Sequence, residues 1–150
     1  MKLAEALQER ADLNQRITAL KSRLINNALV QEGEEPNEEP KELLSELNDC
    51  IDRLEKLIAR INLTNCETKI DGESLTILLA RKDAMTLRLG AYRDLAGAAG
   101  QNSRRATRSE IKLLSTVNVR NIQREADSIA KALRELDNSI QAANWSTELI

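Results

Sequence analysis

The chain has 150 residues and a formal net charge of −2, so its overall charge gives no attraction to nucleic acid or to an anionic membrane. It contains no histidine, which removes the commonest general base and the commonest transition-metal ligand and excludes Ser-His-Asp and Cys-His nucleophile systems. Aromatic residues are only 1% of the chain, so the core must consist of Leu, Ile and Ala. We expect one soluble helical domain, residues 1–150, with no cofactor, and the composition favours a protein that is not an enzyme. A carboxylate-only Mg²⁺ or Mn²⁺ site stays an alternative, although no acidic pair stands out from an exposed helix face.

An internal repeat is the most informative pattern. Residues 3–24 and 75–96 share one pattern, with Leu3 matching Leu75 and Arg16 matching Arg88, and residues 47–64 share another with residues 129–146. A repeated helix–loop–helix unit is typical of folds that stack one supersecondary unit on another. We therefore predict pseudo-repeat halves, 1–65 and 74–147, that form an antiparallel four-helix bundle from two helical hairpins.

The first hairpin is predicted over residues 2–27 and 40–62. The first of these helices has the narrow apolar seam of a coiled coil, and Pro40 suits the first position of the second helix, where its missing N–H costs nothing. The second helix carries a wider apolar stripe. Its members are Leu43, Leu44, Leu47, Cys50, Ile51, Leu54, Leu57, Ile58 and Ile61.

The second hairpin follows a connection at residues 63–73, where Asp71-Gly72 is a turn signal. Ser74 is the predicted N-cap of a helix that runs to residue 98, and the fourth helix is expected over 118–144. Segments 28–32 and 110–117 are partly β-like, and we predict that they pair as a short two-stranded ribbon at one end of the bundle. The alternative is irregular loop with an early start to the fourth helix.

The two cysteines, Cys50 and Cys66, lie too far apart along a predicted helix for a disulfide. We interpret Cys50 as a core residue and Cys66 as a loop residue on the surface, with a reactive thiol as the alternative. The first residues mix charged and apolar side chains, unlike a signal peptide, and no segment is long and apolar enough to span a membrane. We therefore expect a cytoplasmic protein without a membrane partner.

Arg10 and Lys82 occupy the same heptad position in the two copies, on otherwise apolar faces. A buried cation needs a carboxylate, a phosphate or water, so these residues are candidates for an anion or ligand site. The alternatives are that they reach solvent at the bundle edge or form a buried pair that fixes the helix register.

The ends of the second and fourth helices carry matched polar residues that could bind a small polar ligand or a second subunit. These are Asn62, Thr64, Asn65, Asn144, Ser146 and Thr147. The alternative is ordinary helix termination, with local hydrogen bonds to the backbone.

The two hairpin loops have opposite charge. The first is rich in glutamate, and the second carries Arg104, Arg105, Arg108 and Lys112. Three interpretations stay open: solvated loops, subunit assembly, or RNA binding by segment 104–112. The last is the weakest, because no stacking aromatics accompany the basic residues. Trp145, the only tryptophan, is expected to dock onto its own bundle or onto a neighbouring subunit.

Three stretches resemble a family of small bacterial proteins often labelled septicolysin: ALVQEGEEP at 28–36, ARINLTNCET with LTILLARKDAMTLRL within 59–89, and TRSEIKLLSTVNV with IQAANWSTEL within 107–149. The resemblance covers nearly the whole chain and implies a helical, cytoplasmic protein of unknown function with no catalytic residues to transfer. The label suggests a pore-forming toxin, but the sequence lacks an export signal and membrane-spanning β-hairpins. The function that we predict first is therefore a self-assembling interaction or scaffold protein that forms a homo-oligomer. A small-ligand or anion-binding bundle and a weak RNA-binding protein are the alternatives, and the identity of any small-molecule ligand is open.

Overall fold

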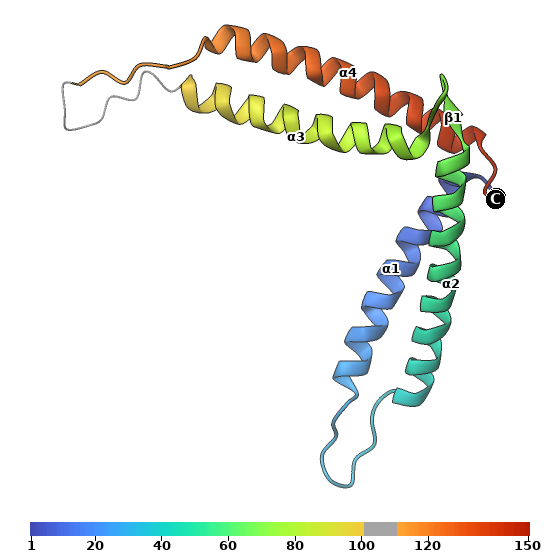
Figure 1. Cartoon of the computed structure of the whole chain (residues 1–150). Coiled ribbons are helices and arrows are strands. Elements are labelled where there is room, and N and C mark those ends of the chain that lie inside the picture. The colour runs from blue at the N-terminus through green and yellow to red at the C-terminus, as the bar shows by residue number, and fades with distance from the viewer. Residues whose placement is uncertain (101–110) are drawn as a thin grey trace. The chain divides into compact units, whose positions relative to one another are not determined.

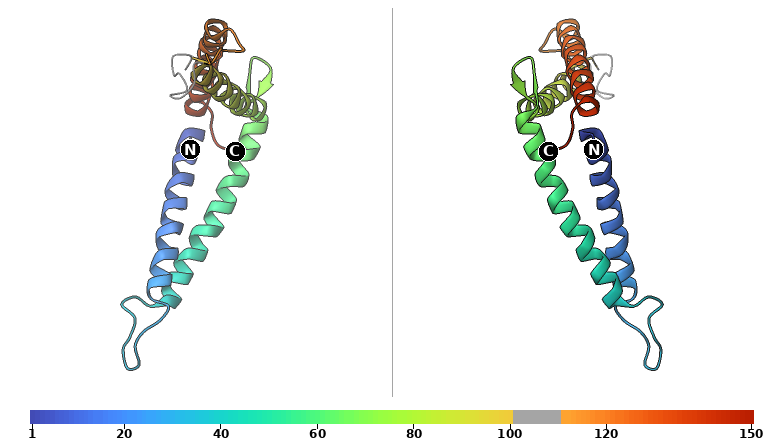
Figure 2. Two further views of the ribbon diagram at one scale, coloured as in Figure 1. Left: turned by 90° about the vertical axis from the view of Figure 1, so that its left-hand side faces the viewer. Right: turned by 90° about the vertical axis from the view of Figure 1, so that its right-hand side faces the viewer.

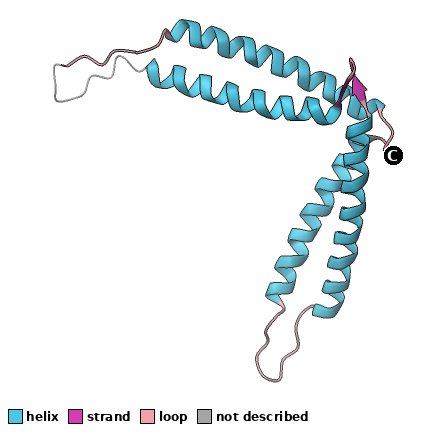
Figure 3. Cartoon of the chain, viewed as in Figure 1, coloured by secondary structure: helices cyan, strands magenta, loops and turns pink. Residues whose placement is uncertain are grey.

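A computed structural model describes residues 1–100 and 111–150, which form four helices and one two-stranded sheet. In order along the chain, the elements are α1 (Leu3–Asn26), α2 (Pro40–Glu67), β1 (Lys69–Ile70), β2 (Glu73–Ser74), α3 (Leu75–Ala99) and α4 (Val119–Ser146) (Figures 1 and 3). The predicted fold class, mainly α with four helices in two hairpins and a short β-ribbon, is confirmed.

Two compact units divide the chain. One comprises Met1–Lys69 together with Ala143–Ile150, and the other comprises Ile70–Ala142. This division is close to the predicted halves, 1–65 and 74–147, except that residues 143–150 belong with the first unit. The end of the chain therefore helps to build the first hairpin.

The first unit contains α1 and α2, which lie side by side and antiparallel in every view (Figures 1 and 2). Glu5 fixes the start of α1 because its carboxylate accepts a hydrogen bond from the backbone N–H of Lys2 at 2.7 Å. Pro40 is the first residue of α2, as predicted, and the Glu39 side chain caps that helix. The buried seam between the helices follows a heptad pattern. Its members are Leu3, Ala6, Leu13 and Leu20 of α1 and Leu43, Cys50, Leu57, Ile61 and Thr64 of α2.

The second unit contains all of α3 and most of α4, which also run antiparallel (Figure 1). Ser74 caps α3, as predicted, and its hydroxyl accepts a hydrogen bond from the N–H of Ile77 at 3.4 Å. The buried residues include Leu75, Leu78, Leu89 and Ala96 of α3 and Ala126 and Ile140 of α4.

The β-ribbon connects α2 to α3. Asp71 (φ 51°) and Gly72 (φ 89°) form its turn, and two central residues with positive φ are typical of a two-residue hairpin. The turn signal in the sequence is thus confirmed, but the predicted ribbon of 28–32 with 110–117 is wrong in position. Neither 28–32 nor 111–117 is a strand, and residue 110 lies outside the described residues. The tight turn at 71–72 places β1 and β2 within a few residues of each other along the chain. The predicted pairing would instead have required two loops far apart in the sequence to meet.

Helix α2 continues to Glu67, beyond the predicted end at residue 62. The Thr64 hydroxyl donates to the Arg60 carbonyl oxygen at 2.8 Å within the helix, so this polar residue does not end it. As a result Cys66 lies in the last turn of α2 and not in a loop, although it is exposed as predicted, and Cys50 is a buried core residue as predicted. In the described part of the chain, no helix has the length and apolar character needed for a membrane crossing.

Candidate functional site

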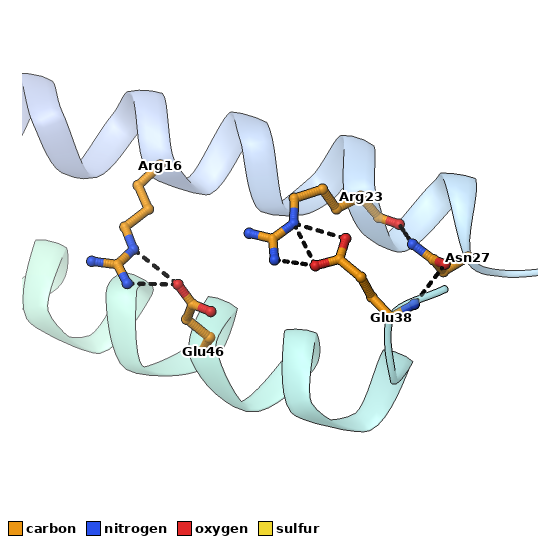
Figure 4. Close-up of polar contacts among 5 residues, drawn as sticks. All are labelled: Arg16, Arg23, Asn27, Glu38 and Glu46. Atoms are coloured by element: carbon orange, nitrogen blue, oxygen red, sulfur yellow. Dashed lines mark hydrogen bonds and ion pairs between the residues drawn. The ribbon is translucent and has the colours of Figure 1, made fainter. Parts of the chain in front are cut away.

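Ion pairs line one edge of the first hairpin and join α1 to α2 and to the end of the loop before α2. The Arg16 guanidinium lies 2.6 Å from Glu46, and Arg23 pairs with Glu38 in the same way (Figure 4). Arg53 pairs with Glu9 farther along the same edge. These three pairs, which we call the ion-paired edge, connect residues on one flank of the buried seam, as in an antiparallel coiled coil.

The ion pairs shift the pKa values of their members. The hydrogen bond from Arg23 lowers the pKa of the Glu38 carboxyl, and the hydrogen bond to Glu46 raises the pKa of Arg16. Asn27 strengthens the loop end of this edge, because its side-chain oxygen accepts from the Glu38 N–H at 3.1 Å while its amide donates to the Arg23 carbonyl at 2.9 Å (Figure 4).

The opposite edge of the same hairpin is apolar. Leu44, Ile51 and Ile58 of α2 are spaced by seven residues and retain 48%, 43% and 38% of their surface exposed. Each follows a buried seam position by one residue, which places the three about 100° around the helix from the buried row and away from Glu46 and Arg53. We call these three residues the apolar edge. Complete burial of a Leu or Ile side chain contributes roughly 1.5–3 kcal/mol, so covering this edge would be stabilising.

The C-terminal tail, residues 147–150, is anchored on the first hairpin. The Ile150 N–H donates to the Thr64 hydroxyl at 3.1 Å, and Arg60 donates to the Ile150 main-chain oxygen at 2.6 Å. Thr64 is completely buried. Its hydroxyl therefore joins the end of α2 to the tail.

The tail also pairs with the start of α1. The Leu3 N–H donates to the Thr147 oxygen at 2.9 Å, and the Leu149 N–H donates to the Met1 oxygen at 2.8 Å. Around this backbone pairing the Glu148 carboxylate lies 2.7 Å from the Lys2 ammonium, and its hydrogen bonds to Lys2 and to the N-terminal amine lower its pKa.

The predicted polar cluster at the helix ends lies within this first unit. Thr64 and Asn144 are buried, Asn65 and Thr147 are half-buried, and Asn62 and Ser146 are exposed. The Ser146 hydroxyl donates to the Ala143 carbonyl at 3.2 Å. The Ser146 hydroxyl thus bonds locally at the end of α4, as the helix-termination alternative expects, whereas Thr64 lies inside α2 and binds the tail. A ligand at these six positions stays a prediction.

Arg10 and Lys82 lie in different units. Lys82 of α3 pairs with Asp137 of α4, and this hydrogen bond lowers the pKa of the Asp137 carboxyl. Arg10 is half-buried on α1. The Lys82–Asp137 pair is partly exposed, so a buried pair that fixes the register and an anion site that uses both Arg10 and Lys82 stay predictions.

Trp145 is 65% exposed. With Met1, Ala4 and Gln8 it lines a surface hollow of about 580 Å³. The predicted interface residues Arg104, Arg105 and Arg108 lie outside the described residues, while Lys112 is exposed.

A second shallow hollow of about 480 Å³ lies between α1 and α2, beside the ion-paired edge. Its walls carry three carboxylates and three cationic side chains: Glu9, Asp49 and Asp52, with Arg53, Lys56 and Arg60. The two signs balance, so this hollow favours neither a cation nor an anion. Across residues 1–100 and 111–150, no group of three or more His, Cys, Asp or Glu residues is placed to hold a metal ion.

Several residues of these features were not predicted from the sequence as site residues. Glu148 and Ile150 of the tail anchor, and Asp137 opposite Lys82, depend on partners far away in the sequence. The signal that could have identified the apolar edge was present, because the predicted stripe of the second helix is wider than one helical partner requires.

Residues 10–149 match a protein family described as a family of unknown function (DUF6847). The chain belongs to this family. A search among curated proteins finds no match to this DUF6847 member.

The chain is also similar to a solved structure, the crystal structure of a functionally unknown conserved protein from Corynebacterium diphtheriae. The two sequences are 41% identical, the TM-score is 0.95, and the match covers 100% of this chain and 99% of that one. Neither description carries the septicolysin name, so the predicted resemblance is confirmed only as membership of an uncharacterised family with a bacterial relative.

Proposed function

We propose that this DUF6847 protein is a non-catalytic, self-assembling interaction protein whose first hairpin associates through its apolar edge. The observation that supports this proposal is the contrast between the two edges of one hairpin. Glu9, Arg16 and Arg23 of α1 close one edge with ion pairs, whereas Leu44, Ile51 and Ile58 leave the other edge apolar and partly exposed. Two helices that needed only each other would carry charged pairs along both edges.

The other candidate functions have less support. To bind a small ligand or an anion, the Lys82 ammonium would have to give up its ion pair with Asp137. The Thr64 hydroxyl would likewise have to give up a hydrogen bond within the chain. For RNA binding, no aromatic residue that could stack on a base accompanies the basic segment 104–112. Both therefore rank below self-assembly.

Replacement of Ile51 by Glu tests the proposal. A charge placed in the middle of an apolar contact must lose its hydration when the contact forms, so we expect Ile51→Glu to weaken association by at least tenfold, which is about 1.4 kcal/mol. The measurement is size-exclusion chromatography with light scattering over a range of concentrations, with circular dichroism to confirm that the helices persist.

Ile25→Glu is the matched control. Ile25 is also an exposed isoleucine of the first hairpin, at 72% exposure, but it lies outside the apolar edge. We expect this control to associate like the unmodified protein. If Ile51→Glu folds and associates as strongly as the control, the proposal is wrong.

A further inference from the structure

Helix α3 carries a second apolar stripe, on the side away from its buried residues. Ile77 and Leu87 are 51% and 77% exposed. The exposed alanines Ala80, Ala84 and Ala91 lie between and beyond them at helical spacing. We call these five residues the outer stripe of α3. A helix with apolar stripes on two faces can bury only one of them inside its own hairpin, so the second unit alone leaves the outer stripe exposed.

We infer that the occupant of the apolar edge is the outer stripe of α3 from a second copy of the chain. This inference rests on the proposed function, because it names the partner surface for the same edge. Both surfaces repeat at seven-residue intervals: Leu44, Ile51 and Ile58 on α2, and Ile77 and Ala84 on α3. Two helices with the same heptad period can interlock along their length.

The sizes of the side chains on the two surfaces are complementary. The apolar edge presents three large branched side chains, whereas the outer stripe has alanines at positions 80, 84 and 91. Large residues that face small ones allow helix surfaces to interdigitate without voids. Two copies of the apolar edge, in contrast, would place large side chains against large side chains.

The charges beside the two surfaces favour one orientation of the contact. Glu55 lies on the outer flank of the apolar edge, and Arg88 lies on one flank of the outer stripe, whereas Asp83 and Asp94 lie on its other flank. Glu55 and Arg88 are exposed, and neither forms an ion pair within the described ranges 1–100 and 111–150. An α2–α3 contact between copies that places Arg88 beside Glu55 would bring opposite charges together and thereby select that orientation.

Each copy carries both surfaces, so a two-fold dimer would form the contact twice. Stable interfaces bury about 1,600 Å² in total, and the repetition doubles the area that one helix pair supplies. A contact that did not close on itself would instead continue into a filament.

Disulfide crosslinking between two differently sized versions of the full chain tests this inference. Both versions carry Cys66→Ser, so that no exposed native thiol competes, because Cys50 is buried. One version carries Ile51→Cys and the other carries Leu87→Cys. Since a disulfide needs Cα atoms within about 7 Å, the expected main product of oxidising the mixture is a covalent heterodimer. The control pairs Lys56→Cys, on another face of α2, with Leu87→Cys and should give no such product.

The other outcomes separate this inference from the proposed function. A dimer that crosslinks only through Ile51→Cys with itself overturns the inference and leaves self-assembly in place. Crosslinking within one chain of an Ile51→Cys/Leu87→Cys double variant, with none between chains, also overturns it. An uncrosslinked protein that remains a monomer at every concentration overturns both.

Discussion

Thr64 illustrates how one residue connects two ends of the chain. Its hydroxyl donates to the Arg60 carbonyl at 2.8 Å and accepts from the Ile150 N–H at 3.1 Å, and the whole residue is buried. The first bond lies inside α2, and the second holds the C-terminal tail. A residue with both roles stabilises the hairpin beyond its own helix.

We predict that Thr64→Val destabilises the protein by about 1 kcal/mol, because the valine keeps the shape of the side chain but cannot accept the hydrogen bond from the tail. The free energy of unfolding from urea denaturation measures this effect. Thr86→Val is the matched control, since the Thr86 hydroxyl donates to the Lys82 carbonyl at 2.9 Å on an exposed helix face. The control should change stability by less than about 0.5 kcal/mol. Equal effects in the two variants would contradict a role for Thr64 in holding the tail.

The sequence predicted part of this cluster. It identified Thr64, Asn144 and Ser146 because the same polar residues end both repeats. It did not predict that the Thr64 hydroxyl would bind Ile150, since that bond depends on how the tail turns back onto α2. A repeat in the sequence shows which positions carry polar residues, whereas the hydrogen-bond partners of those residues depend on how the chain folds.

At the scale of the elements, the two edges of the first hairpin have different physical character. In the ion-paired edge Arg16 pairs with Glu46 of α2 and Arg23 with Glu38 just before it, while the apolar edge leaves Leu44, Ile51 and Ile58 partly exposed. Exposed ion pairs contribute little individually, typically below about 1 kcal/mol. Their value here is that they fix which side of the hairpin remains apolar.

The ion-paired edge predicts a dependence on acid. Because Arg23 lowers the pKa of Glu38 in the folded state, the Glu38 carboxylate stabilises the fold above the ordinary glutamate pKa of about 4.3. That contribution is lost as the pH falls through the lower, folded-state value. We expect the unmodified protein to resist urea better than Glu38→Gln near neutral pH and the two to converge in strong acid. Glu35→Gln, in the same loop and without an ion pair in the described part of the chain, should show no such convergence. A constant difference between the unmodified protein and Glu38→Gln at every pH would contradict the assignment.

The sequence predicted the helices better than the ribbon. Pro40 and Ser74 begin α2 and α3 as expected, because capping and N-terminal preferences act within a few residues. The prediction of a ribbon from 28–32 and 110–117 is wrong, because β-like composition alone does not identify which segments pair. The two-residue turn at Asp71-Gly72 carried the more local signal, and the structure follows it.

At the scale of the whole molecule, the repeat explains the existence of two similar hairpins but not how their exposed apolar surfaces are covered. The first hairpin has the apolar edge, and α3 has the outer stripe with Leu87 at 77% exposure. Monomeric proteins seldom leave contiguous apolar surfaces of large extent open to water. If copies of the chain cover one another's surfaces, self-association explains both the apolar edge and the outer stripe of α3.

Sedimentation velocity of the unmodified full chain, over a wide range of concentrations, tests this account most directly. The account predicts a species whose mass is a whole-number multiple of the 16.8 kDa chain and whose population grows with concentration. A single species of 16.8 kDa at every concentration would contradict it.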